Sequence, residues 1–203
     1  MLTVKNVLGE DFDLCCKRLC SNIREQDYIP DIIIGVLTGG GYVGRKVFKE
    51  FEAFNQPIFY KEIKLQRKST KAKSDSKVRK IFKILPYSVL NIMRILEMEL
   101  LELKAKFVKP SRCGTIDLDE ETIALLKHGG MKVLLVDDAI DTGMTLKIVK
   151  NFLVNQFNET NDIKIAVVTS TNRHPVMEAD FFLYNRVLIR FPWASDVKES
   201  CNY

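Results

Sequence analysis

Apolar and polar residues follow two different periods along this chain. Short, mostly apolar runs at 32–36, 58–63, 133–136 and 163–169 predict strands, and the run at 133–136 is apolar enough to be buried on both faces. Between these runs, apolar residues recur every three or four positions, which predicts helices over 11–24, over 42–54 and from Leu146 onward. The alternation predicts an α/β fold with a parallel sheet flanked by helices.

A further helix is predicted over 120–128 from its apolar spacing. Asp119 is its expected N-cap, and Gly129-Gly130 is expected to end it. The segments between the main elements are predicted to be a turn at 38–41, a return strand at 81–85, a linker at 108–116 and one or two strands at 181–190.

One more helix, predicted over 86–106, has a different pattern. Pro86 suits its first turn, and apolar residues follow with alternating spacings of four and three. This stripe is typical of a coiled coil, and the helix is too apolar to stand alone. We expect it to pack on the core, with packing across a dimer as the alternative. The stripe consists of Val89, Met93, Leu96, Leu100 and Leu103.

A basic segment interrupts the pattern at residues 64–80. Between Lys61 and Lys83 there are ten Lys or Arg residues but only two acids, Glu62 and Asp75. This composition predicts a flexible loop, which is either an ordinary solvated loop or a lid that closes on a polyanion. Nucleic acid is disfavoured as a partner, because residues 64–80 contain no aromatic residue on which a base could stack.

Length and composition narrow the class of protein. The chain has 203 residues, 46% of them hydrophobic, and a net charge of +5, which suits one α/β domain over residues 1–203. Neither a signal-peptide pattern nor a membrane-length apolar run is present, so no membrane partner is expected. Two histidines, and five cysteines without Cys-x-x-Cys spacing, disfavour a zinc site. We expect reduced thiols and a cytoplasmic protein.

The stretch from Val133 to Leu146 carries the most chemistry. An apolar strand is followed by Asp137, Asp138 and Asp141, and then by a Thr/Gly loop that opens a helix. Carboxylates bind hydroxyls and cations, whereas a loop at a helix N-terminus offers backbone N–H groups to a phosphate. Carboxylates next to a phosphate-binding loop favour a phosphorylated sugar as ligand.

A glycine-rich stretch, Gly39 to Gly44, is a second candidate phosphate loop. It matches G-x-G-x-x-G after a strand, and a dinucleotide site would need an acid at the end of the next strand. Glu62 lies near that position, but Lys61 and Lys64 flank it. A dinucleotide site is therefore the weaker interpretation.

The string Val-Asp-Asp-Ala-Ile-Asp-Thr-Gly-Met-Thr, at 136–145, resembles the phosphoribosyl-pyrophosphate (PRPP) motif of type I phosphoribosyltransferases. With an aspartate before Thr-Gly, it is most similar to the hypoxanthine/guanine/xanthine branch. The resemblance extends to a strand followed by a Gly-Gly pyrophosphate loop at 37–40, a hood loop at 64–80 and a Pro-Trp turn at 192–193. It implies the type I core with a helical insertion at 86–106 and a C-terminal hood region at 170–203.

The resemblance also implies roles for individual residues in PRPP binding and catalysis. Asp141 would be the catalytic base or hydrogen-bond partner of the purine. Asp137 and Asp138 would bind the ribose hydroxyls and lie near Mg²⁺, which they would hold mostly through water and ligand oxygens. The 5′-phosphate would be bound by Ile140, Asp141, Thr142, Gly143, Met144 and Thr145, and the pyrophosphate by Thr38, Gly39 and Gly40.

The acceptor side follows the family pattern less closely. The lysine that usually reads the purine oxygen is missing from 168–173, so Arg173 or nearby hydroxyls would replace it. The expected base pocket comprises Ser170, Arg173, Leu188, Ile189 and Trp193. We therefore expect transfer of phosphoribose from PRPP to a nucleobase, a 6-oxopurine first, by a homo-oligomer (dimer or tetramer). The alternatives are a different acceptor, or a non-catalytic sensor of PRPP or a nucleotide.

Overall fold

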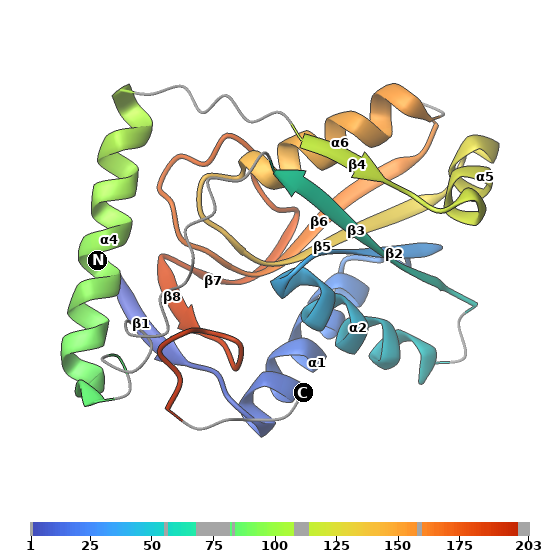
Figure 1. Cartoon of the computed structure of the whole chain (residues 1–203). Helices are drawn as coiled ribbons and strands as arrows, with labels where there is room; N and C mark the ends of the chain where they lie inside the picture. Colours follow the sequence, from blue (N-terminus) through green and yellow to red (C-terminus); the bar gives the residue numbers. More distant parts are fainter. Residues whose placement is uncertain are drawn as a thin grey trace.

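A computed structural model describes residues 2–54, 57–67, 82, 84–107, 114–157 and 160–198 (Figure 1). Its centre is a six-stranded sheet in the order β4-β3-β2-β5-β6-β7. All neighbours are parallel except β3 and β4, which are antiparallel. The predicted α/β fold with a parallel sheet is confirmed. The strands are β2 (Ile32–Val36), β3 (Phe59–Arg67), β4 (Gly114–Asp117), β5 (Lys132–Ile140), β6 (Asp162–Ser170) and β7 (Phe181–Asn185).

Helices cover both faces of this sheet, because successive side chains of its central strands point in opposite directions. In β5, Leu134 and Val136 pack into the core beneath α1 and α2, whereas Val133 and Leu135 pack into the core beneath α5 and α6. The helices are α1 (Glu10–Glu25), α2 (Gly39–Glu52), α5 (Glu120–His128) and α6 (Met144–Gln156).

A second, two-stranded sheet lies beyond the main one. In it β1 (Thr3–Asn6) pairs in parallel with β8 (Val187–Arg190), which brings together two strands from opposite ends of the sequence. Helix α4 (Tyr87–Phe107) lies beside this pair at the edge of the molecule (Figure 1). A small core of Leu2, Met98 and Leu188 joins α4 to the two strands.

Several predicted boundaries were wrong. The glycines at 39–41 form the first turn of α2 instead of a turn before it. Strand β5 continues through Asp137 and Asp138 to Ile140, because its pairing with β6 extends that far. The cap of α5 is confirmed: the side chain of Asp119 accepts a hydrogen bond from the backbone N–H of Thr122.

The segment between β3 and β5 also differs from the prediction. Residues 64–67, predicted as loop, belong to β3, because they pair with residues 114–117. Residues 114–116 were predicted as linker and form part of β4 for the same reason. Phe82 and Ile84 are helical, which contradicts a return strand at 81–85. The rest of the predicted basic loop, 68–80, lies outside the described residues.

The predicted packing of α4 was also wrong in its detail. The helix does pack on the body of the protein, but through Leu90 and Met98, which are nearly fully buried. The five residues of the predicted stripe all remain exposed. A stripe of the coiled-coil type thus lies on the outer side of a helix whose opposite side faces the body. Over the described residues, no helix is long and apolar enough to span a membrane.

Candidate active site

The carboxyl end of β5 lies against the beginning of α2. A β-carbon on Gly39 would lie 2.0 Å from Oδ2 of Asp138, and one on Gly40 would lie 2.7 Å from the Cα of Asp137. Only a residue without a side chain permits this approach. The two glycines thus bring the predicted pyrophosphate loop and the acid pair into direct contact.

Asp137 and Asp138 are adjacent in sequence and share hydrogen bonds. The backbone N–H of Asp138 donates to Oδ1 of Asp137 over 2.9 Å, and the indole N–H of Trp193 donates to Oδ2 of Asp138 over 3.0 Å. Burial raises the pKa of both carboxyl groups, and the charge of Asp138 raises the pKa of Asp137 further. A positive charge brought close to this pair would stabilise its ionised form.

The loop after β5 lies against the segment that follows β6. Gly143 has a φ of 75° and is the N-cap of α6, and a β-carbon there would lie 2.6 Å from the backbone oxygen of Met177. The hydroxyl of Thr171 lies 2.8 Å from Oδ1 of Asp141, to which it donates. Asp141 is exposed, so its second oxygen can reach a ligand.

A cavity of about 290 Å³, which we call the loop cavity, lies between this loop and the start of α2. It brings together most of the residues predicted to bind PRPP, with the exception of Met144 and Gly40. Its walls comprise Leu37, Thr38, Gly39, Leu101, Asp137, Asp138, Ala139, Ile140, Asp141, Thr142, Gly143, Thr145 and Leu146.

A larger cavity of about 590 Å³, the α4 cavity, opens next to it. The two cavities share Leu101, Asp138, Ala139 and Asp141. Three residues of the predicted base pocket line the α4 cavity, namely Leu188, Ile189 and Trp193. Much of the rest of its wall comes from α4, through Leu90, Met93, Arg94, Glu97, Met98 and Leu101. The apolar spacing of this helix showed that it must pack against something, but not that it faces this cavity.

Trp193 is held by protein side chains. Its ring stacks with those of Tyr42 and Phe191, each at a centroid distance of 4.8 Å, and meets Phe12 edge-on at 5.3 Å. Together with the hydrogen bond to Asp138, these contacts fix the indole beside the acid pair.

Two residues of the predicted base pocket are placed elsewhere. Among the described residues, neither Ser170 nor Arg173 is found in the wall of the α4 cavity. Ser170 is the last residue of β6, and Arg173 is exposed, with its backbone N–H donating to Glu102 over 3.2 Å. Glu102 also forms an ion pair with Arg186, whose guanidinium donates to the backbone oxygen of Thr171 over 2.7 Å. These contacts hold α4 against the loop after β6.

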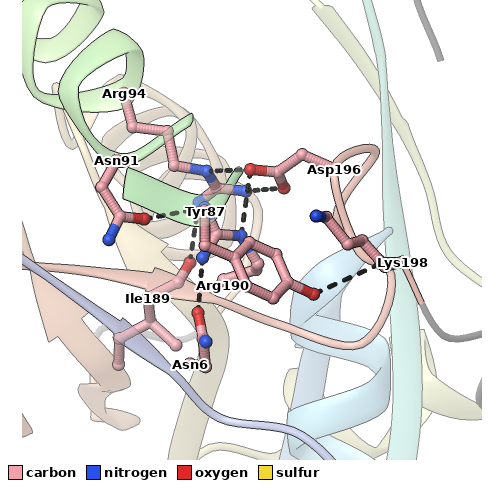
Figure 2. Close-up of polar contacts among 8 residues, drawn as sticks. All are labelled: Asn6, Tyr87, Asn91, Arg94, Ile189, Arg190, Asp196 and Lys198. Atoms are coloured by element: carbon pink, nitrogen blue, oxygen red, sulfur yellow. Dashed lines mark hydrogen bonds and ion pairs between the residues drawn. The ribbon is translucent and has the colours of Figure 1, made fainter. Parts of the chain in front are cut away.

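A second set of contacts holds the N-terminal half of α4 against β8 and the turn after it (Figure 2). Arg94 donates to both carboxylate oxygens of Asp196, over 2.9 and 2.6 Å, and to the backbone oxygen of Ile189 over 3.1 Å. The fully buried Arg190 donates to Asp196 over 3.0 Å. Burial alone would raise the pKa of Asp196, but the hydrogen bonds and charges of Arg94 and Arg190 outweigh it and hold that pKa below its usual value.

The remaining contacts of Arg190 join three further elements to this cluster. Its guanidinium donates to the side-chain oxygens of Asn6 in β1 and of Asn91 in α4, and it lies 4.5 Å from the ring centre of Tyr87. Asp196 therefore joins the turn after β8, which carries Trp193, to α4 and β8, and Arg190 extends these contacts to β1. Sequence reasoning missed this cluster, because its members lie up to 190 positions apart.

A metal ion would find only part of its ligands in the protein. In the part of the chain that the structure describes, no group of three or more His, Cys, Asp or Glu side chains is placed to hold one. Asp137 and Asp138 offer two adjacent carboxylates at the wall of the loop cavity. This set suits Mg²⁺, which keeps several waters and commonly binds one or two carboxylates together with phosphate oxygens.

The glycines at the start of α2 and the acid pair meet at the carboxyl ends of the strands of a mostly parallel sheet, which is where ligands bind in α/β proteins of this kind. A family model described as "Phosphoribosyl transferase domain" matches residues 10–199. The chain therefore belongs to the phosphoribosyltransferase domain family, and the prediction of a phosphoribosyltransferase is confirmed at that level. No curated protein matches it.

Solved structures agree on the fold. A purine phosphoribosyltransferase from Pyrococcus horikoshii is similar, with a TM-score of 0.56 and 20% identity over 94% of this chain and 93% of that one. Xanthine-guanine-hypoxanthine phosphoribosyltransferase from Helicobacter pylori has a TM-score of 0.56 and 13% identity, over 95% and 93%. A hypothetical protein from Neisseria gonorrhoeae with bound ppGpp has a TM-score of 0.56 and 15% identity, over 95% and 90%.

Proposed function

We propose that this phosphoribosyltransferase transfers the phosphoribosyl group of PRPP to a nucleobase, with a purine as the first candidate, and releases pyrophosphate. The observation that carries the proposal is the junction of the two cavities at Asp138 and Asp141. One cavity has the groups that a sugar phosphate needs, and the other has an apolar wall suited to a flat ring. Their shared wall is where the bond between sugar and base would form.

Residues 140–145, all of which except Met144 line the loop cavity, bind the 5′-phosphate, since the loop and the N-terminus of α6 supply N–H groups and hydroxyls. Thr38, Gly39 and Gly40 bind the pyrophosphate at the N-terminus of α2. Asp137 and Asp138 accept hydrogen bonds from the ribose hydroxyls. Mg²⁺ bound to the pyrophosphate would neutralise its charge, and the acid pair would hold that ion mostly through water.

The reaction places positive charge on the sugar. As the bond from C1′ to pyrophosphate breaks, the ring becomes oxocarbenium-like, as in glycoside chemistry generally. The raised pKa values of Asp137 and Asp138 mean that their ionised form gains from a nearby cation. Asp141 takes the ring proton of the incoming base, or orients its nitrogen, and the hydroxyl of Thr171 holds that carboxylate in place.

The residues identify the acceptor base less specifically than they identify PRPP as the donor. A 6-oxopurine is the first candidate from the motif, and the Pyrococcus and Helicobacter relatives are named for purines. The lysine that the branch uses for the purine oxygen is missing at 168–173. A non-purine base is therefore the second candidate. A nucleotide-sensing role is the third, supported by the ppGpp bound to the Neisseria protein of similar fold.

The test is an assay of the purified 203-residue chain with PRPP, Mg²⁺ and single bases, in which pyrophosphate and nucleotide are both measured. The panel contains hypoxanthine, guanine, xanthine, adenine, uracil and orotate. Equal amounts of pyrophosphate and nucleotide with a purine support the proposal. Turnover with a pyrimidine alone would show that the acceptor is a pyrimidine and not a purine. Tight binding of PRPP or ppGpp without turnover of any base would favour the sensor.

A further inference from the structure

Glu102 of α4 and Arg186 form an ion pair beside the candidate site, yet neither is among the described residues that line the two cavities. Their side chains are 15% and 16% exposed, so both charges are largely withdrawn from water. Such a pair adds little net stability, because the cost of desolvating two charges offsets most of their attraction. Stability alone therefore does not account for the two charges at this place.

Arg186 is a single-residue connection between β7 and β8 that contacts the end of β6. Its backbone N–H donates to the backbone oxygen of Ser170 over 2.8 Å, and its guanidinium donates to the backbone oxygen of Thr171 over 2.7 Å. Its φ is 62°, a left-handed conformation that residues with a β-carbon seldom adopt. Glycine would adopt this conformation more readily, so an arginine here indicates that its side chain is needed.

Thr171 lies between Arg186 and Asp141. It is 2% exposed, and its backbone N–H donates to the backbone oxygen of Ile140 over 2.9 Å. Its hydroxyl lies 2.8 Å from Oδ1 of Asp141 and 3.1 Å from the backbone oxygen of Ile140. The hydroxyl has one hydrogen, and the carboxylate is both the nearer and the stronger acceptor. The position of the Thr171 backbone therefore sets the orientation of the Asp141 carboxylate.

We propose that Arg186 and Glu102 are positioning residues for Asp141 and that they act through Thr171. The contacts run from Glu102 to Arg186, from Arg186 to Thr171, and from Thr171 to Asp141. This inference rests on the proposed function, in which Asp141 acts on the ring nitrogen of the incoming base. It adds two residues that lie outside the cavity walls and still affect the step at the base.

The helix that carries Glu102 also forms the wall against which the base would lie. Leu101, the preceding residue, lines both cavities, and Met98, one turn earlier, lines the α4 cavity. The Sδ of Met98 lies 3.6 Å from the hydroxyl of Thr171. One helix would thus place both the base and the carboxylate that acts on it. A misplacement of about 1 Å can cost about a hundredfold in rate, so this shared support favours a reactive alignment.

The experiment is a double-mutant cycle that measures kcat/KM for the base. It uses the 203-residue chain, PRPP, Mg²⁺ and the base of the panel above that turns over fastest. Glu102→Leu combined with Arg186→Met removes both charges together and leaves no buried charge unpaired. This paired substitution should lower kcat/KM about fivefold, the effect of one hydrogen bond, and leave the KM for PRPP unchanged.

The second half of the cycle repeats the paired substitution in the Thr171→Val background. There it should have almost no further effect, because the hydroxyl through which both residues act is gone. A purely structural role would instead give losses that add. Glu102→Leu combined with Arg186→Gly is a second form of the pair, because glycine suits a φ of 62°, and it should show the same loss.

Arg186→Lys and Lys46→Met are the controls. One nitrogen of Arg186, Nη1, makes the contacts with both Glu102 and Thr171, so a lysine ammonium can replace it and should keep most of the kcat/KM. Lys46→Met breaks an ion pair with Asp13 between α2 and α1, away from the described cavity walls, and should change nothing in kcat/KM. Near-ultraviolet circular dichroism and the thermal midpoint of each variant report whether the fold is kept.

The outcomes separate this inference from the function on which it rests. An unaltered chain that converts no base contradicts the proposed function, and this inference with it. If the unaltered chain is active, an unchanged kcat/KM in the folded paired variant overturns the positioning role alone. A loss that adds in full to that of Thr171→Val, or one confined to PRPP affinity, also overturns it.

Discussion

The loop cavity and the α4 cavity meet at Asp138 and Asp141, yet they are built in different ways. The loop cavity takes nine of its thirteen wall residues from one stretch of chain, 137–146, and adds Leu37, Thr38 and Gly39 from the start of α2 and Leu101 from α4. The α4 cavity is assembled from α4, the ends of β5 and β6, β8 and the turn at 191–196. A site encoded in one stretch can be recognised as a motif, whereas a site assembled from distant elements cannot.

The two cavities also differ in what holds them. The loop cavity depends on close backbone approach at Gly39, Gly40 and Gly143. The α4 cavity depends on side-chain ion pairs, with Asp196 and Glu102 as the acids that fasten its wall. We therefore expect changes in the loop cavity to act on chemistry and PRPP binding, and changes in the α4 cavity to act on stability and on the acceptor.

The largest expected effect is that of Asp141→Asn. If Asp141 handles the proton of the acceptor, turnover should fall by about 10² to 10⁴-fold. The affinity for PRPP should stay nearly unchanged, because the amide keeps the size of the side chain and the phosphate is bound by the loop. Single-turnover kinetics and PRPP binding by calorimetry measure the two quantities. Loss of PRPP affinity with an intact fold would show that the carboxylate of Asp141 binds PRPP and does not act on the base.

Asp196→Asn should lower stability by weakening the contacts that hold the wall of the α4 cavity. Removing the negative charge of Asp196 leaves the buried positive charge of Arg190 without its ion-pair partner. Breaking a buried ion pair lowers the free energy of unfolding by about 3 kcal/mol. The folded-state pKa of Asp196 is lowered, so its contribution is present at neutral pH and is lost as pH falls through that pKa. Urea titrations at neutral and acid pH should show the difference between the two proteins shrinking in acid.

The control for that experiment is Glu121→Gln. Glu121 pairs with Lys61 at the surface, where the acid is 65% exposed, so its loss should change stability by less than about 1 kcal/mol. Equal losses for the two variants would mean that the cluster at Asp196 has no special stabilising effect.

Gly39→Ala should weaken PRPP binding by about tenfold. The added carbon would lie 2.0 Å from the carboxylate of Asp138, so the start of α2 or the acid must move by a distance that matters for positioning. Gly41→Ala is the matched control, since the added carbon there meets the end of the flexible Leu37 side chain. Calorimetric titration with PRPP and Mg²⁺ compares them. Identical affinities would argue against a role of the 39–41 turn in binding.

Thr171→Val should have the smallest effect. It removes the hydroxyl that donates to Asp141 while keeping the shape of the side chain, at a cost of about 1 kcal/mol, or roughly fivefold in kcat/KM for the base. The KM for PRPP should not change. A change confined to PRPP would place Thr171 on the donor side of the boundary.

The sequence by itself determined the fold class and most of the residues that line the loop cavity. Strand and helix periods are local properties of the chain, and the residues from Asp137 to Thr145 bring their chemistry together without any long-range contact. Element ends were harder to predict, because pairing decides them: β5 reaches Ile140 through β6, and residues 64–67 become strand through β4.

Only the tertiary structure decided the rest. The spacing in α4 showed one apolar stripe, but the side that faces the body carries Leu90 and Met98 instead, and its contacts with Leu2, Leu188 and Arg190 come from residues distant in sequence. Trp193 is stacked on Tyr42 and hydrogen-bonded to Asp138, which a local pattern cannot specify. Long-range packing decides which side of a helix is buried, because burial depends on the residues that the fold places next to it.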